Sequence, residues 1–352
     1  MAYTTIDDPT AYFQTKLYTG NGSTQSITLD GLNDMQPDWV WVKQRGGTTN
    51  HKTSDSVRGA TKALQNNDTD AEATDTDGIT SFDSNGFSLG AGGDYNSSSA
   101  SQVAWNWKAG TSFTNDASST GIGTIDSAGS ASDASGFSIV SYTGTESAGT
   151  IKHGLSSAPK MIIAKDRASG SLSWFVGHAS LGFTKRLKLD GTNAAADNTV
   201  WNNTNPTSSV FSVGDSANAN TSGNAIIAYC FAEKQGYSKF SSYTGNGNAD
   251  GTFIYTGFKP AWIMLKRTDG TNSWCIFDNK RLGRNPNNPR LYANNSNASE
   301  GASDEAYVDI LSNGFKLRGA QPDINASGGT YIYMAFAENP FVTSTGVPAT
   351  AR

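Results

Sequence analysis

Three landmarks recur in the same order along the chain, and this internal repetition limits the fold more than any other sequence feature. The first is a Tyr-Thr-Gly string, the second is a Pro followed by an apolar run that ends in Lys, and the third is an aromatic-rich run. The copies extend from Tyr18 to Trp107, from Tyr142 to Phe231 and from Tyr243 to Phe336. The chain therefore contains three diverged copies of one unit of roughly 90 to 100 residues.

The second landmark predicts a strand that is buried on both faces. Its copies are Pro37–Lys43, Pro159–Lys165 and Pro260–Lys266, and the five residues between Pro and Lys are nearly all apolar. A proline is tolerated at the start of a strand, and a continuous apolar run suits a strand without a solvent face. Stacking the three units against one another would bury the second face, which predicts a pseudo-threefold arrangement.

Turn signals separate these runs and predict short antiparallel strands. Asn-Gly or Asp-Gly pairs occur at 21–22, 85–86, 269–270 and 313–314, and such pairs close two-residue hairpins. We therefore expect an all-β protein of three tandem antiparallel β-sandwich repeats, of the jelly-roll or lectin-like kind, with a barrel as the open alternative. An Asp-x-x-Arg pair also recurs, at Asp55 and Arg58 and at Asp278 and Arg281.

The landmarks divide the chain into six segments. We expect an N-terminal arm over 1–16, β repeats over 17–109, 136–235 and 236–341, and a C-terminal tail over 342–352. Residues 110–135 are mostly Gly, Ser, Thr, Ala and Asp, which predicts an exposed linker between the first two repeats.

Charge and composition argue against several classes of protein. The net charge is −5, whereas a nucleic-acid binder normally presents a basic face. The start of the sequence shows no signal peptide, and no apolar run approaches the roughly 18 residues of a membrane span. Cys230 and Cys275 stand at non-equivalent places in their repeats, so they are interpreted as small apolar residues.

The sequence contains no recognisable catalytic or cofactor motif. Its three histidines have no metal-ligand spacing, and we predict no enzyme activity, no cofactor and no metal site. The acidic run Asp68–Asp77 could be a Ca²⁺ loop, but it lacks the EF-hand pattern and also fits a solvated loop. A pair of carboxylates for glycoside cleavage could lie among the 31 acidic residues, because such pairs are matched in space.

Two repeated features have both a functional and a structural interpretation. Lys43, Lys165 and Lys266, each with an Arg nearby, could hold an acidic sugar; the favoured interpretation is that their stems cover apolar surface while the charges reach water. Trp174 and Trp274 lie in polar runs and are our candidate glycan contacts, with core packing as the favoured alternative.

Several long strings resemble a family of phage proteins. YTGNGSTQSI, PDWVWVKQR, SFDSNGFSLG, AYCFAEKQGYSKF and YIYMAFAENPF resemble repeat proteins encoded by marine tailed bacteriophages, notably those that infect marine cyanobacteria. The resemblance covers residues 12–341 and is least over 108–135. It implies a virion structural or tail-fibre-like protein with a lectin-like sandwich, and it brings no active site.

These observations lead to one expected role and two alternatives. We expect a tail-fibre or tail-tip component on the virion exterior that serves host adsorption through surface glycans. The alternatives are a capsid decoration or knob protein on the head lattice, and a polysaccharide depolymerase. The protein would be made in the host cytoplasm and would have other virion proteins and a host glycan as partners, but no nucleic acid and no inserted membrane, and formation of a homo-oligomer stays open.

The N-terminal arm is the expected attachment point to a neighbouring chain. It precedes the first repeat and carries Tyr3, Ile6, Tyr12 and Phe13. A simple edge strand on the first repeat is the alternative interpretation.

Overall fold

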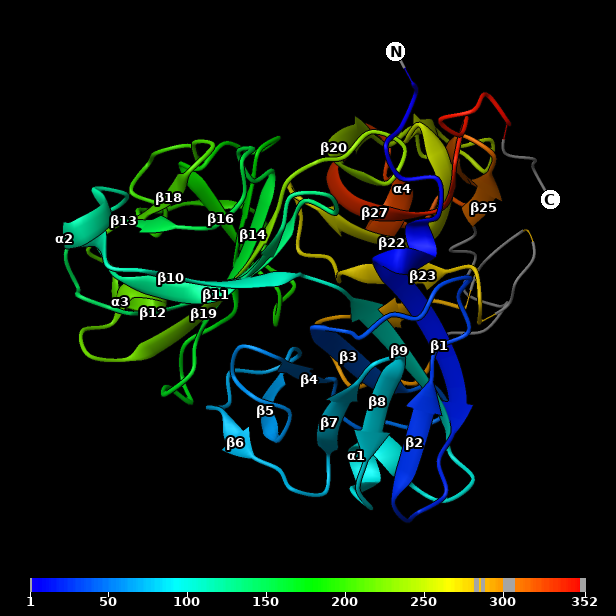
Figure 1. Cartoon of the computed structure of the whole chain (residues 1–352). Coiled ribbons are helices and arrows are strands. Elements are labelled where there is room, and N and C mark those ends of the chain that lie inside the picture. Colours follow the sequence, from blue (N-terminus) through cyan, green and yellow to red (C-terminus); the bar gives the residue numbers. More distant parts are fainter. Residues whose placement is uncertain (1, 282–284, 286–288, 300–307, 349–352) are drawn as a thin grey trace.

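The computed structural model describes residues 2–281, 285, 289–299 and 308–348. Within these residues the chain folds into antiparallel sheets, and every α-helix has four residues, which confirms the all-β prediction (Figure 1). Residue 1 of the predicted arm and residues 349–352 of the predicted tail lie outside the described residues.

The first repeat forms one large and one small sheet. Its elements are η1 (Pro9–Ala11), β1 (Phe13–Thr19), β2 (Gln25–Thr28), β3 (Trp39–Gln44), β4 (Lys52–Asp55), β5 (Lys62–Gln65), β6 (Ala73–Thr74), β7 (Ile79–Asp83), β8 (Gly86–Leu89), α1 (Gly93–Asn96) and β9 (Ser101–Trp107). The large sheet has the strand order β1-β9-β3-β4-β5-β6, and the small sheet has the order β2-β8-β7.

The second repeat has the largest sheet, with eight strands. Its elements are β10 (Thr111–Asn115), α2 (Ala117–Thr120), β11 (Ser127–Ser132), β12 (Phe137–Thr143), β13 (Gly149–Lys152), β14 (Met161–Asp166), β15 (Phe175–His178), β16 (Lys185–Lys188), β17 (Ala196–Asp197), β18 (Val210–Val213), α3 (Ala217–Asn220) and β19 (Ala225–Phe231). The strand order is β10-β11-β12-β19-β14-β15-β16-β17, and β13 pairs with β18 in the small sheet.

The third repeat returns to the plan of the first. Its elements are β20 (Ser238–Thr244), β21 (Phe253–Tyr255), β22 (Phe258–Arg267), β23 (Cys275–Asp278), β24 (Leu291–Tyr292), β25 (Val308–Leu311), β26 (Gly314–Leu317), α4 (Pro322–Asn325) and β27 (Thr330–Pro340). The described strands form a large sheet of order β20-β27-β22-β23-β24 and a small sheet of order β21-β26-β25.

The three sequence landmarks are adjacent strands in each large sheet. In every repeat the closing aromatic strand lies between the Tyr-Thr-Gly strand and the Pro–Lys strand and is antiparallel to both, as in β1-β9-β3, β12-β19-β14 and β20-β27-β22. The Pro–Lys strand and the closing strand have neighbours on both sides in every repeat, and these two landmark runs are the most apolar parts of each copy. The Tyr-Thr-Gly strand lies at the sheet edge in the first and third repeats.

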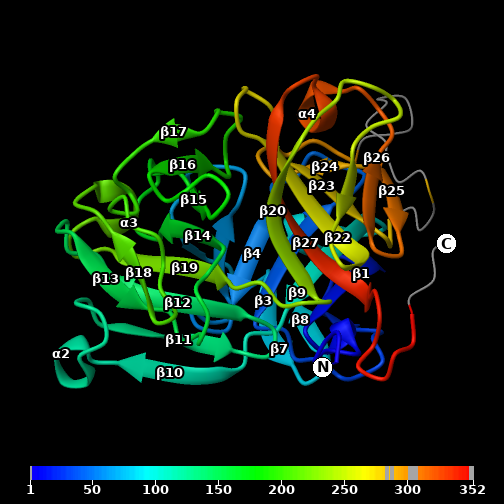
Figure 2. The same ribbon diagram turned by 90° about the horizontal axis from the view of Figure 1, so that it is seen from above.

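The central strands of each large sheet are buried on both faces because their side chains belong to two hydrophobic cores. In β3, Val40 and Val42 face the small sheet of their own repeat, whereas Trp39 and Trp41 face a core that all three repeats share. The same alternation occurs in the second repeat, with Ile162 and Ala164 against Met161 and Ile163, and in the third, with Ile263 and Leu265 against Trp262 and Met264. Figure 2 shows the three large sheets gathered around one centre.

Aromatic rings from different repeats meet in this shared core. The ring of Trp39 stacks on Trp107 of its own repeat and on Tyr229 of the second repeat, with centroid distances of 4.4 Å in both cases. Trp107 in turn lies 5.5 Å edge-on from Trp262 of the third repeat. The repeats therefore do not have separate interiors, and part of the apolar surface of each is covered only by the other two.

The Tyr-Thr-Gly string holds the turn that precedes the closing strand. In the first repeat the Tyr18 hydroxyl donates to the Tyr95 carbonyl (2.8 Å), and a Cβ on Gly20 would lie 2.2 Å from the Ser97 carbonyl oxygen. The other two copies repeat both contacts: Tyr142 with Ala219, Gly144 with Thr221, Tyr243 with Ile324, and Gly245 with Ala326. A glycine is needed at this place because backbone atoms leave no space for a side chain.

A buried asparagine completes this turn, and the sequence interpretation did not single it out. The Asn96 amide donates to the Gly90 carbonyl (2.8 Å), and its side-chain oxygen accepts from the Asn21 N–H (3.0 Å). Asn220 and Asn325 make the corresponding bonds in the other repeats. All three stand 11 residues before the closing aromatic residue, a regularity that could have identified them.

The interpretation of residues 110–135 as an exposed linker is wrong. β10 and β11 form a hairpin that pairs with β12 and so extends the large sheet of the second repeat. The sequence did not predict these two strands, because their small and polar side chains give little apolar periodicity. Gly129 shows why small residues are required: a Cβ there would lie 2.1 Å from the Ile139 carbonyl oxygen.

The N-terminal arm binds its own chain, which corrects its predicted role as an attachment point. Ile6 and Phe13 are buried in the shared core, and Tyr12 packs edge-on against Tyr237 of the third repeat (5.9 Å). The Tyr3 hydroxyl donates to the Gly257 carbonyl (2.7 Å). These apolar side chains are therefore used to fasten the first repeat to the third.

Candidate functional site

The three repeats meet at three junctions that share one backbone contact. An N–H group of one repeat donates at 2.8 Å to a carbonyl of the next: Glu72 to Arg167, Ala195 to Thr268, and Ser299 to Arg45. The accepting residue always stands two positions after the repeated lysine. These contacts identify equivalent positions at the first (repeats 1 and 2), second (repeats 2 and 3) and third (repeats 3 and 1) junctions.

The repeated lysines are buried beside these junctions and have a structural role. Lys165 Nζ donates to the carbonyls of Ser169 (2.9 Å) and Leu172 (3.0 Å) in its own turn and of Thr69 (3.1 Å) across the first junction. Lys266 likewise reaches the Thr192 carbonyl across the second junction (3.2 Å). The expectation that these charges reach water is corrected, because the ammonium groups bind backbone carbonyls instead. Burial lowers the pKa of Lys266 to about 8.

Trp174 and Trp274 do not reach the surface, so their assignment as glycan contacts is corrected. Each is at most 1% exposed. Their indole N–H groups donate across junctions, from Trp174 to the Gln65 carbonyl (2.7 Å) and from Trp274 to the Lys188 carbonyl (2.8 Å). A buried Trp N–H usually has a hydrogen-bond partner, and here the neighbouring repeat provides it.

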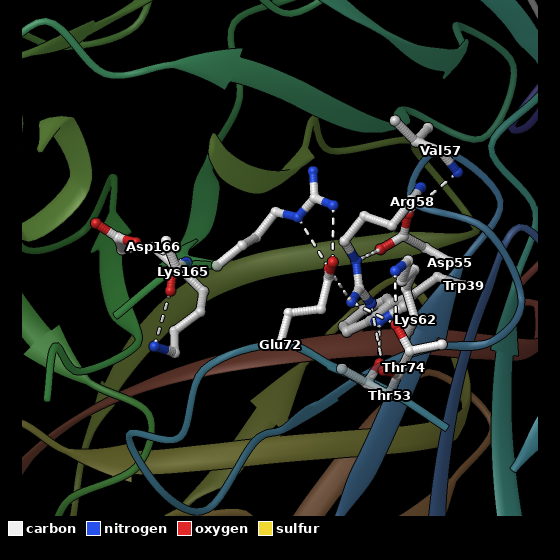
Figure 3. A network of polar contacts seen from close by, with 12 residues as sticks. Trp39, Thr53, Asp55, Val57, Arg58, Lys62, Glu72, Thr74, Lys165 and Asp166 are labelled. Carbon is white, nitrogen blue, oxygen red and sulfur yellow. Dashed lines mark hydrogen bonds and ion pairs between the residues drawn. The ribbon is translucent and has the colours of Figure 1, made fainter. Parts of the chain in front are cut away.

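The first junction contains a buried ionic network. Asp55 accepts from Arg58 Nε (2.5 Å) and from the Tyr229 hydroxyl of the second repeat (2.7 Å). Glu72 accepts from Arg58 Nη1 (3.1 Å), as Figure 3 shows. It also accepts from Nε and Nη2 of Arg167 (2.9 and 2.8 Å). Burial alone would lower the pKa of Arg58, but Asp55 beside it raises that pKa above its ordinary value.

The acidic run Asp68–Asp77 therefore has one structural member. Glu72 bridges two repeats, while Asp68 and Asp75 accept backbone N–H groups two residues further along their own loop. The described part of the chain holds no group of three or more His, Cys, Asp or Glu side chains placed to bind a metal ion.

The second junction lacks this network and contains a groove. His178, Leu181 and Ala195 stand where the first junction has Asp55, Arg58 and Glu72. A groove of about 670 Å³ opens there, and its lining includes Ser180, Lys185, Ala195, Ser242, Thr244, Thr268, Asp269 and Thr330. Hydroxyl groups and charges of both signs give it many hydrogen-bond donors and acceptors, so we consider it the candidate ligand site.

Buried histidines make the fold sensitive to acid. His51, His153 and His178 are fully buried, and burial is the main reason that their pKa values are lowered, to about 4 for both His153 and His178. Between pH 6.5 and 4 the unfolded chain binds protons at these histidines that the folded chain does not bind. The free energy of unfolding therefore has its full value above pH 6.5 and decreases as the pH falls toward 4. We expect His153 and His178 each to contribute a loss of about 2 to 3 kcal/mol at pH 4.5.

Urea unfolding at pH 7.5 and 4.5 measures this effect. His178→Asn is the informative variant, because an Asn oxygen can replace Nδ1 as the acceptor of the Ser180 N–H (3.1 Å). We expect this variant to lose less stability than the wild type between the two pH values. Equal losses in the two proteins would contradict the assignment to His178.

Comparisons with known proteins identify a family. No helix in the described residues is long and apolar enough to cross a membrane. No curated protein and no solved structure matches the chain. One family, a domain of unknown function named DUF7483, matches residues 8–340, which include all three repeats. The chain thus belongs to the DUF7483 family.

Proposed function

We propose that this chain is a non-enzymatic structural protein on the exterior of a bacteriophage virion and that it serves host adsorption by binding surface glycans. The proposal combines the resemblance to marine phage repeat proteins with the groove at the second junction. A tail-fibre or tail-tip position agrees best with this role. The repeats around the groove share one core, which provides the rigid frame that a ligand site requires.

The single observation that carries the glycan assignment is the chemistry of the groove. The first junction is closed by Arg58, Glu72 and Arg167, whereas the second has Leu181, Ala195 and Thr268 at those places. The groove thus has hydroxyl-bearing residues in its lining where the first junction has a closed ionic network. Sugars are recognised by such convergent donors and acceptors.

Replacing each of two neighbouring alanines by glutamate tests the groove. Ala195 lines it, while its neighbour Ala196 in β17 is exposed and does not. We expect the wild type to bind a subset of a glycan array, Ala195→Glu to weaken that binding by about tenfold or more, and Ala196→Glu, with the same net charge, to retain it. An array without any bound glycan, or equal effects of the two variants, would contradict the glycan assignment.

The alternative role is a decoration or knob protein on the virion head. The threefold gathering of three like sheets favours it, because a closed shell of subunits offers threefold positions to which such a body could dock. An electron-microscopy reconstruction of the intact particle separates the two roles. Density on the tail supports adsorption, and density on the head lattice supports decoration.

A further inference from the structure

Among the described residues, the third junction keeps the arginines of the first but has no carboxylate between them. Arg281 takes the place of Arg58, since both follow a buried aspartate by three residues and donate to it through Nε. Arg45 takes the place of Arg167, because each accepts the junction N–H. Where the first junction has Glu72, the third has Ser299, whose hydroxyl accepts from Arg281 Nη1 (3.2 Å).

Counted over the residues that the structure describes, the two arginines of the third junction face only one carboxylate. Nε of Arg45 is buried and has no hydrogen-bond partner. Burial and the neighbouring Arg281 lower the pKa of Arg45, and Asp278 only partly opposes them. The one acid of the junction among the described residues, Asp278, is already engaged by Arg281 Nε (2.6 Å) and by the indole N–H of Trp105 (3.2 Å).

The first junction shows which group fits between such arginines. There the Glu72 carboxylate accepts two bonds from one guanidinium and a third from the other. Paired bonds between a guanidinium and a carboxylate are among the strongest polar contacts in proteins. The Ser299 side chain is shorter than that of Glu72 and carries no carboxylate, so the carboxylate between the arginines would have to come from another molecule.

We propose that the third junction binds the carboxylate group of a small acid or an acidic sugar between Arg45 and Arg281. This site is separate from the groove at the second junction and does not depend on the function proposed for that groove. Arg45 provides the paired donors, as Arg167 does for Glu72. Ser299 and Arg281 fix the other side of the carboxylate.

Thermal unfolding of the full chain tests this site. The probes are sodium acetate and sodium glucuronate against sodium chloride at equal ionic strength, with glucose as the neutral sugar. We expect both carboxylates to raise the melting temperature, by about 2 °C or more near saturation, and glucose to have no effect. Glucuronate acting at a tenfold lower concentration than acetate identifies an acidic sugar, and equal concentrations identify a bare carboxylate.

Two variants and one control make the test specific. Arg45→Gln should abolish the response to carboxylates. Ser299→Glu should abolish it as well and should raise the melting temperature in chloride alone, because it rebuilds the Arg–Glu–Arg bridge of the first junction. Arg267→Gln removes a partly buried arginine that pairs with Asp269 and should retain the response. The proposal would be overturned if carboxylates did not raise the melting temperature of the wild type, or if they still raised that of the Arg45→Gln variant.

Discussion

Replacing Asp55 by Ala is expected to lower the free energy of unfolding by about 3 to 5 kcal/mol. Both side chains of the Asp55–Arg58 pair are fully buried, so the substitution leaves a guanidinium without its main counter-charge. It also removes the acceptor of the Tyr229 hydroxyl, which belongs to the second repeat. Urea or guanidinium unfolding of the purified chain measures the loss.

The exposed pair of Lys185 and Asp197 is the matched control. Its aspartate side chain is 83% exposed, and such pairs contribute little because water screens them. Asp197→Ala should therefore change the unfolding free energy by no more than about 0.5 kcal/mol. If Asp55→Ala lost as little unfolding free energy as Asp197→Ala, the buried network would not be what holds the first junction together.

Replacing Trp39 by Ala is expected to cost about 3 to 5 kcal/mol and to weaken all three repeats together. The indole lies between Trp107 and Tyr229, and its N–H donates to the Thr53 hydroxyl. Removing it opens a cavity in the core that the repeats share. Circular dichroism and tryptophan fluorescence should still give one coincident transition, shifted to lower denaturant.

Leu32→Ala provides the comparison, because Leu32 is 87% exposed and should have almost no effect. The form of the transition decides between a shared and a divided interior. If Trp39→Ala produced two separate transitions, the first repeat would unfold without the others, and the shared core could not be the main source of their stability.

The central strands could be predicted from the sequence because the landmark runs have properties that a strand requires. Pro37–Lys43 contains a continuous apolar run after a proline, and β3 occupies that run. The need for a covered second face also followed from this run, and Trp39 and Trp41 meet that face in the shared core. The hairpin of β10 and β11 could not be recognised, since Ser, Gly and Ala carry no period-two apolar signal.

The polar contacts of the junctions lay beyond the sequence. Arg58 and Tyr229 are separated by 171 positions, and no local pattern indicates that they touch. The Asp-x-x-Arg pair could be recognised in the sequence, but nothing in the sequence indicated that it is buried. Trp174 stands in a polar run that is typical of a surface, yet a carbonyl of another repeat satisfies its N–H and permits burial.

The three unequal junctions show what joining the repeats in one chain makes possible. In a trimer of identical subunits every substitution occurs three times, so a change that helps one contact is imposed on the other two. Here Glu72, Ala195 and Ser299 occupy one equivalent position and differ in each copy. A single polypeptide can therefore keep one junction closed by its ionic network while the other two diverge, and a substitution at one junction leaves the other two unchanged.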